Sequence, residues 1–70
     1  MNQGDLSQLS KRETEVLHLI VQGLSSKQIA EQMQVQHETI RTYRKRIYAK
    51  LKVHKLVELM RLHNNKHHNQ

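Results

Sequence analysis

The 70-residue chain contains no cysteine, proline, phenylalanine or tryptophan, and it has only two glycines and two tyrosines. Without cysteine, disulfide bonds and thiolate metal sites are excluded. A chain of this length buries only about 60% of the surface that its unfolded form exposes, so it has no room for an enclosed substrate cavity. The composition therefore indicates one small domain that is held together by helix packing alone.

Long apolar stretches are missing as well. The longest uninterrupted apolar run covers residues 19–21, whereas a membrane-spanning helix needs roughly 18 apolar residues in succession. The N-terminus is polar and carries Asp5 where a secretion signal would carry basic residues and then a hydrophobic stretch. We therefore predict a cytoplasmic protein, and the chain has the features of either a complete small gene product or an excised domain.

One segment lacks acidic residues altogether. Residues 41–55 contain seven basic side chains and no acidic one, and they account for most of the net charge of +6. These basic residues are Arg41, Arg44, Lys45, Arg46, Lys50, Lys52 and Lys55. A localised positive field gives a polyanion both attraction and orientation. The segment therefore favours nucleic-acid binding, and the alternative is an ordinary solvated helix face.

Capping residues and apolar spacing predict four helices. The first, at about residues 11–22, follows a capping box of Ser10 and Glu13 and precedes Gly23, which suits a left-handed helix end. The second, at about 26–33, follows a second capping box, formed by Ser25 and Gln28. After a short break we expect a third helix at about 37–51 and a fourth at about 55–63.

The apolar residues of these helices define the expected core. The inward positions are Val16, Leu17, Ile20 and Leu24, then Ile29, Ala30 and Met33, and then Ile40, Tyr43, Ile47 and Leu51, with Val35 filling the core from a turn. Leu56, Leu59, Met60 and His63 form a fourth stripe, of which we expect only a part to pack against the first helix. On the third helix Tyr48 and Ala49 are expected to face outward with the basic residues. We assign residues 9–63 to the domain, residues 1–8 to an N-terminal arm and residues 64–70 to a disordered polar tail.

The second and third helices, joined by a three-residue turn, form a helix-turn-helix pattern. The sequences at residues 9–17 (LSKRETEVL), 23–30 (GLSSKQIA), 39–43 (TIRTY) and 47–53 (IYAKLKV) closely resemble the LuxR/GerE family of bacterial DNA-binding domains. The resemblance covers residues 9 to about 60. It implies an all-α four-helix bundle with a central helix-turn-helix and a fourth, dimerisation helix, and the chain looks like the solitary, GerE-like type.

The resemblance also implies roles for individual residues. It places Arg41, Thr42 and Lys45 against base edges, although the division between base and phosphate contact stays open for the two basic residues. It assigns phosphate contacts to Ser26, Lys27, Thr39, Tyr43 and Lys50, and we add the flanking Arg44 and Arg46. Such roles agree with the chemistry, since arginine can bond guanine bidentately and helix amides can bind phosphate.

Four positions depart from the pattern of the family. Gln36 replaces the usual serine cap of the third helix, Tyr43 replaces a histidine, Lys52 replaces a frequent glycine, and Leu56 replaces a frequent arginine. We expect a poorer cap at the start of the third helix. Glu13 is expected either to brace a basic residue of that helix or only to cap its own helix.

The fourth helix carries more apolar surface than one packing seam needs. We predict a dimer interface there, formed at least on DNA, from Leu56, Val57, Leu59, Met60, Leu62 and His63.

Other chemistry is not predicted. His63, His67 and His68 lack the fixed geometry of a metal site, no catalytic constellation is evident, and we expect no cofactor and no small-molecule substrate. Two tyrosines are too few for a platform that stacks single-stranded bases.

Three functions fit these patterns to different degrees. The first is a bacterial transcription regulator, associated with the nucleoid, that binds double-stranded DNA sequence-specifically as a homodimer with its third helix in the major groove. The alternative is a protein–protein antagonist whose fourth helix pairs with a larger LuxR-type regulator. A basic helix lying on acidic membranes is the weakest, because too little apolar area remains once the third helix is packed.

Overall fold

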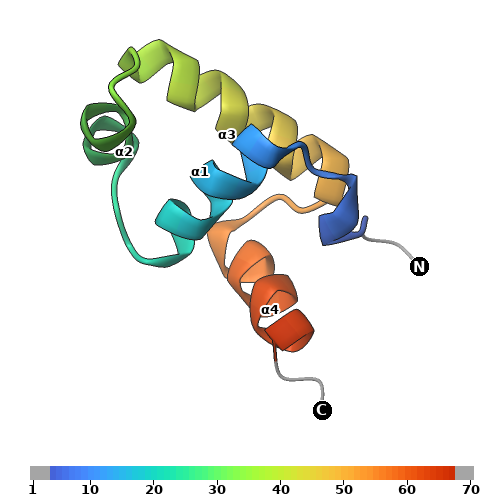
Figure 1. Cartoon of the computed structure of the whole chain (residues 1–70). Helices are drawn as coiled ribbons and strands as arrows, with labels where there is room; N and C mark the ends of the chain where they lie inside the picture. The colour runs from blue at the N-terminus through green and yellow to red at the C-terminus, as the bar shows by residue number, and fades with distance from the viewer. Residues whose placement is uncertain (1–3, 68–70) are drawn as a thin grey trace.

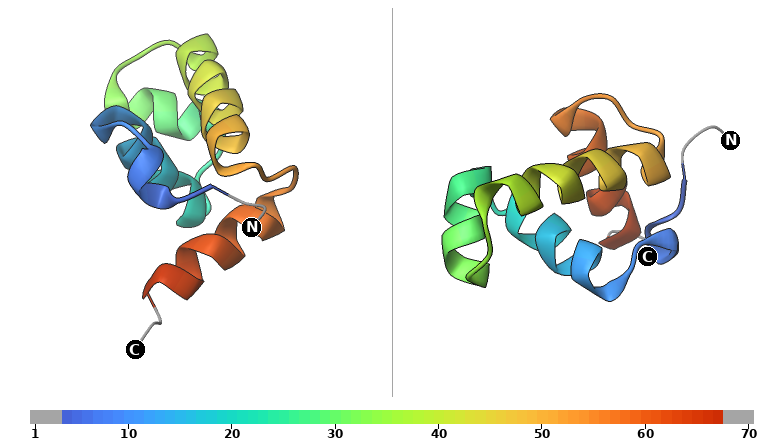
Figure 2. Two further views of the ribbon diagram at one scale, coloured as in Figure 1. Left: turned by 90° about the vertical axis from the view of Figure 1, so that its right-hand side faces the viewer. Right: turned by 90° about the horizontal axis from the view of Figure 1, so that it is seen from above.

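The computed structural model describes residues 4–67, which form one short 3-10 helix and four α-helices and no strand. The elements are η1 (Leu6–Gln8), α1 (Lys11–Val21), α2 (Ser26–Met33), α3 (His37–Leu51) and α4 (Leu56–His67). Helix α3 packs against both α1 and α2, whereas α4 extends away from this group and contacts α1 (Figures 1 and 2). The all-helical prediction and the four helices are confirmed.

Both predicted capping boxes form. The Ser10 hydroxyl accepts from the Glu13 N–H at 3.1 Å, and the Glu13 carboxylate accepts from the Ser10 N–H at 2.8 Å. Ser25 and Gln28 repeat this exchange at the start of α2 with the same two distances. Each box satisfies amides that the first turn of a helix leaves without a partner, so α1 and α2 begin where their serines lie.

Three helices end in left-handed backbone. Gly23 follows α1 with φ 98°, as predicted, while Gln34 ends α2 with φ 61° and Lys52 ends α3 with φ 57°. The turn between α2 and α3 is short, and Gln36 makes no side-chain cap, as its sequence suggested. Helices α2 and α3 therefore meet with a fixed change of direction, which is the helix-turn-helix arrangement.

The core lies where α1, α2 and α3 converge. Its buried apolar residues are Val16, Leu17, Ile20, Ile29, Ala30, Ile40, Ile47, Leu51, Val53 and Leu59. Val35 packs against this cluster from the turn, as predicted. Val53 was not expected here, since it interrupts the helical spacing, yet it is only 3% exposed. Tyr48 was expected outside and instead lies half-buried against the core.

Helix α4 differs from its prediction in extent. It continues to His67, so residues 64–67 are helical and the disordered tail expected there was wrong, while residues 68–70 lie outside the described part. We expected part of the apolar stripe of this helix to be buried and the remainder to be exposed, and Leu56 and Met60 are 43% and 36% exposed. Only a short part of α4 meets the rest of the bundle (Figure 2). Its inward residues are therefore the fully buried Leu59 and the half-buried Leu62.

The described residues of the segment before α1 contact the domain. Asp5 and Gln8 form a capping box around η1, and the Gly4 N–H donates to the Leu51 carbonyl at 2.9 Å. A β-carbon at residue 4 would clash with the Lys50 carbonyl oxygen, so no side chain fits there without a shift. This contact fastens the start of the domain to the C-terminal end of α3.

Candidate nucleic-acid interface

The solvent-facing side of α3 carries the residues predicted to contact bases. Successive residues of a helix are roughly 100° apart, so Arg41, Thr42 and Lys45 fall on the side opposite the buried Ile40 and Ile47. All three are exposed. The side chains that the resemblance assigned to base contact therefore share one accessible face.

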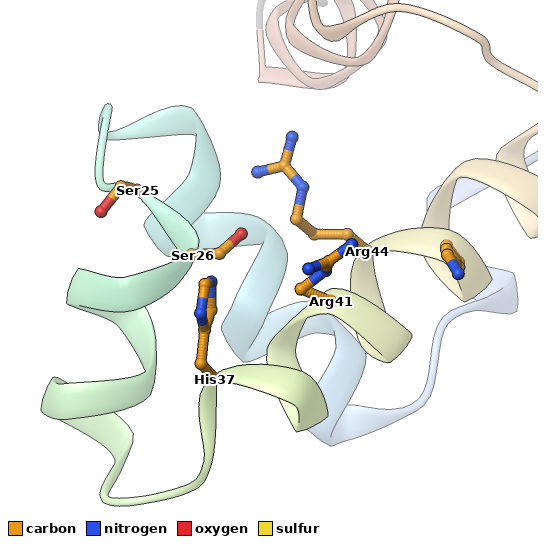
Figure 3. Close-up of a pocket in the computed structure, with 6 residues that line it drawn as sticks. Ser25, Ser26, His37, Arg41 and Arg44 are labelled. Atoms are coloured by element: carbon orange, nitrogen blue, oxygen red, sulfur yellow. The ribbon is translucent and has the colours of Figure 1, made fainter.

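An open depression lies beside this face, between the start of α2 and the first turns of α3. It is lined by Ser25, Ser26, His37, Arg41, Arg44 and Lys45. In Figure 3 the His37 ring points toward Ser26, and the Arg44 side chain extends alongside the start of α2. No acidic residue lines this part of the described surface. The depression therefore combines positive side chains with the amide end of a helix, an arrangement that binds anions.

Two arginines are held against tyrosine rings at the edges of α3. The Arg44 guanidinium carbon lies 5.8 Å from the centroid of the Tyr48 ring, and that of Arg46 lies 6.0 Å from the Tyr43 ring. At these distances the face of an aromatic ring attracts a cation. The helical spacing places Arg44 and Arg46 on opposite edges of the exposed face.

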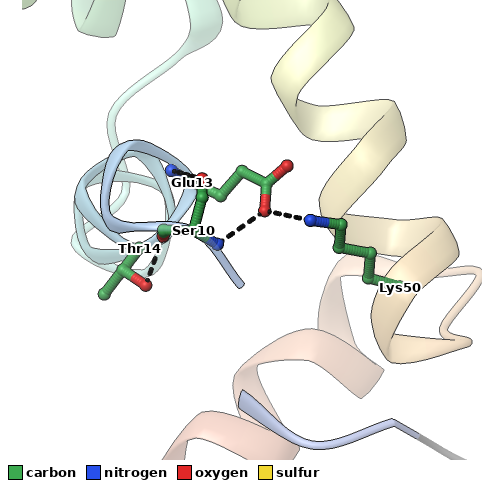
Figure 4. A network of polar contacts seen from close by, with 4 residues as sticks. All are labelled: Ser10, Glu13, Thr14 and Lys50. Atoms are coloured by element: carbon green, nitrogen blue, oxygen red, sulfur yellow. Dashed lines mark hydrogen bonds and ion pairs between the residues drawn. The ribbon is translucent and has the colours of Figure 1, made fainter. Parts of the chain in front are cut away.

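Lys50 belongs to a different contact. Its ammonium lies 2.8 Å from Glu13 Oε1, across from α3 to α1 (Figure 4). Glu13 thus accepts both this bond and the Ser10 N–H, so bracing and capping are both realised. The Lys50 ammonium, together with the Ser10 N–H, holds the pKa of Glu13 below its ordinary value of 4.5, although burial opposes the shift. An ammonium has three donors, so Lys50 keeps N–H groups for further acceptors.

This pair leads to a pH-dependent expectation. Glu13→Gln should lower the free energy of unfolding at neutral pH by about 1 kcal/mol, since the amide loses the charge that faces Lys50 and solvent screens the half-exposed lysine. Folding lowers the Glu13 pKa, so the charged pair stabilises the fold above 4.5 and this stabilisation is lost as pH falls through the folded-state pKa. Urea unfolding of both proteins at neutral pH and about pH 3 measures the difference.

The matched control is Glu15→Gln. Glu15 pairs with Arg12 at 3.3 Å on the open surface, and such exposed pairs contribute little. We expect this variant to unfold like the parent within about 0.5 kcal/mol at both pH values. Equal stability of Glu13→Gln and the parent at neutral pH would show that the bridge between α1 and α3 contributes nothing.

The remaining predicted phosphate residues surround the same face. Ser26 and Lys27 lie in the first turn of α2, and Thr39 lies in the first turn of α3. Lys27 and Thr39 are exposed, while Ser26 and Tyr43 are half-buried. Sequence reasoning did not assign His37 or Ser25 to the site. Their positions in the sequence could have indicated both residues, because a helix-turn-helix brings the first residue of α3 close to the start of α2.

The predicted dimer residues of α4 divide into two groups. Leu56, Val57 and Met60 are exposed, with Val57 the most exposed at 54%. Leu59 is 0% exposed, so its assignment to a dimer interface was wrong: its side chain is committed to the core of its own chain. Leu62 and His63 are half-buried, and the His63 ring meets the His18 ring of α1 edge to face, with centroids 5.9 Å apart.

The described residues contain no cluster of three or more side chains suited to a metal ion. His68 and the side chain of His67, which we considered as ligands, fall outside the described residues. Among residues 4–67 no helix is both long and apolar enough to cross a bilayer.

A basic helix displayed by a helix-turn-helix, with a depression lined by basic side chains beside it, is typical of a helix-turn-helix DNA-binding domain. Residues 7–63 match the model of the family described as GerE, bacterial regulatory proteins of the luxR family. The chain belongs to this family of DNA-binding transcription regulators, which are not enzymes. The family resemblance stated from the motifs is confirmed.

Several regulators are similar to the chain over this domain. The virulence factors transcription regulator BvgA of Bordetella pertussis is 46% identical over 57 residues, which cover 81% of this chain and 27% of BvgA. The Fimbriae Z protein of Escherichia coli K12 is 37% identical over 59 residues, covering 84% of this chain and 28% of that protein. The response regulatory protein YgeK of Escherichia coli K12 is 42% identical over 55 residues, which cover 79% of this chain and 37% of that protein. The chain thus spans a minor part of each relative's length.

Proposed function

We propose that the chain binds double-stranded DNA sequence-specifically as a homodimer, with α3 in the major groove, and so regulates transcription in the bacterial cytoplasm, at the nucleoid. The main support for this proposal is the exposed face of α3, on which Arg41, Thr42 and Lys45 lie together beside a depression that no acidic residue lines. In this proposal those three residues read bases. Phosphate contacts come from Ser26, Lys27, Thr39, Tyr43, Arg44, Arg46 and Lys50.

The test is selection of bound duplexes from a random library at physiological salt. We expect a short inverted repeat whose half-sites lie about one helical turn apart. Affinity should fall steeply with added salt, because about four to six phosphates per subunit release their counterions. Weak binding with no enriched sequence would contradict the proposal.

The apolar surface of α4 supports the dimer. Leu56, Val57 and Met60 are exposed on one helix, and surfaces of this kind mark protein contacts. We expect Val57→Glu to leave the fold intact, since the side chain is 54% exposed, and to weaken binding to the full inverted repeat at least tenfold, or about 1.4 kcal/mol. Binding to a single half-site should change little. Analytical ultracentrifugation of the complexes gives the number of subunits bound.

Thr42→Glu is the matched comparison, since it places the same charge on the DNA-facing helix. It should weaken binding to the half-site and the full site alike. If the Val57→Glu protein bound the full site as tightly as the parent, α4 would not form the dimer contact.

The antagonist remains a second candidate. The same exposed α4 surface supports it, because it suits pairing with the fourth helix of a larger LuxR-type regulator. An antagonist has no need of the basic face on α3, so we rank this function lower. Co-purification with a larger regulator, combined with no selected DNA site for the isolated chain, would reverse the ranking.

A further inference from the structure

Arg44 differs from the other basic residues of α3 in its surroundings. It is half-buried, whereas Arg41, Lys45 and Arg46 are exposed. Within residues 4–67 the ion pairs join Lys50 to Glu13 and Arg12 to Glu15, so no carboxylate holds Arg44. The described contact of its guanidinium is the face of the Tyr48 ring, 5.8 Å from the ring centroid.

The Tyr48 side chain is itself packed against the core. Its ring is half-buried and packs against the hydrophobic core, although helical spacing alone would place it among outward residues. A ring fixed in this way restricts the conformations of the arginine that lies over it. Since a free arginine side chain loses much rotamer freedom on binding, an arginine already restricted loses less.

The restricted arginine lies where an anion would be bound. Arg44 lines the depression together with Ser25 and Ser26 (Figure 3). Helix α2 begins there, and although its capping box uses the amides of Ser25 and Gln28, the amides of Ser26 and Lys27 have no acceptor within the helix. A phosphate in the depression can therefore accept from these amides and from the guanidinium at once.

We propose that Tyr48 is a positioning residue for DNA binding. Its ring holds Arg44 beside the start of α2, so that the guanidinium and the amides of α2 bind the same DNA phosphate. The inference rests on the proposed function, since it concerns how the bound duplex is held. The hydroxyl of Tyr48 has no part in it. The contribution of Tyr48 to affinity comes from the face of its ring, and it should be the same for every DNA sequence.

The experiment compares the parent with Tyr48→Leu, Tyr48→Phe, Arg44→Ala and the double variant Tyr48→Leu/Arg44→Ala. Fluorescence anisotropy with a selected duplex and with an unrelated duplex gives their affinities over a range of salt. Tyr48→Leu should weaken binding to both duplexes by about two- to fivefold, and Tyr48→Phe should bind like the parent.

The salt dependence separates positioning from loss of charge. Arg44→Ala should reduce the slope of log affinity against log salt by about one phosphate contact, while Tyr48→Leu should keep the slope because the arginine is still present. In the Arg44→Ala background, Tyr48→Leu should have no further effect. A loss of the same size in that background, or a Tyr48→Phe variant as weak as Tyr48→Leu, would overturn the inference.

A measurement without DNA completes the test. The side-chain protons of Arg44 should show upfield ring-current shifts in the NMR spectrum of the parent and of Tyr48→Phe, and lose them in Tyr48→Leu. Unshifted protons in the parent would overturn the contact itself. A parent protein that shows the shifts and binds no duplex would instead contradict the proposed function.

Discussion

Replacing Leu59 with alanine should lower the free energy of unfolding by about 2–5 kcal/mol. Leu59 is the one fully buried side chain among the described residues of α4, and it packs into the core at 0% exposure. A domain of this size has a total stability of only about 4–10 kcal/mol, so the change removes a large part of it. Urea unfolding followed by far-ultraviolet circular dichroism measures the loss.

The control for this prediction lies on the same helix. Val57→Ala removes apolar volume from a side chain that is 54% exposed, and we expect a change within about 0.5 kcal/mol. If the two variants unfolded at the same urea concentration, α4 would not be anchored through Leu59. A partial loss of helical signal before the main transition would mean that α4 detaches alone while the remaining helices stay folded.

Arg41→Ala should weaken binding to the selected DNA site by about 1–3 kcal/mol and relax the preference at one base pair of each half-site. The reason is that Arg41 is exposed on the side of α3 that we propose enters the major groove, where a bidentate bond to guanine would carry sequence information. Random-library selection with the variant, scored position by position, gives both quantities.

The comparison for Arg41 is Lys27→Ala. Lys27 is exposed in the first turn of α2, at the margin of the interface. Its loss should weaken all sequences alike and should reduce the salt slope by about one. Lys50 is less suitable, because its replacement also breaks the bridge to Glu13. An Arg41→Ala protein that selects the same sequence with full preference would assign this residue to phosphate instead of base.

The helices could be predicted largely because their signals are local. Ser10 with Glu13, and Ser25 with Gln28, are three residues apart and satisfy each other wherever the rest of the chain lies. The facing of α4 could not be predicted in this way, because Leu56 and Leu59 are both leucines on one helix. Which of them is buried depends on where α4 meets α1, and that is a property of the tertiary packing.

The basic face of the site could be predicted from charge and spacing, but its internal contacts could not. Lys50 and Glu13 are 37 residues apart in sequence, so only the packing of α3 on α1 brings them together. Arg44 and Tyr48 are four residues apart, a spacing that permits contact on a helix. The sequence does not reveal that Tyr48 is half-buried, since its neighbours Lys45 and Lys52 face water.

The left-handed backbone conformation at Lys52 affects the stability of the fold with different residues at this position. A side chain in that conformation costs roughly 1–2 kcal/mol, which glycine would avoid. A cation at the C-terminal end of a helix, however, recovers about 0.3–1 kcal/mol from the partial negative charge of the last carbonyls. The second effect has the opposite sign and offsets part of the first, so the preference for glycine over lysine at this position is reduced. The residue that ends α3 can therefore carry a positive charge at little cost in stability.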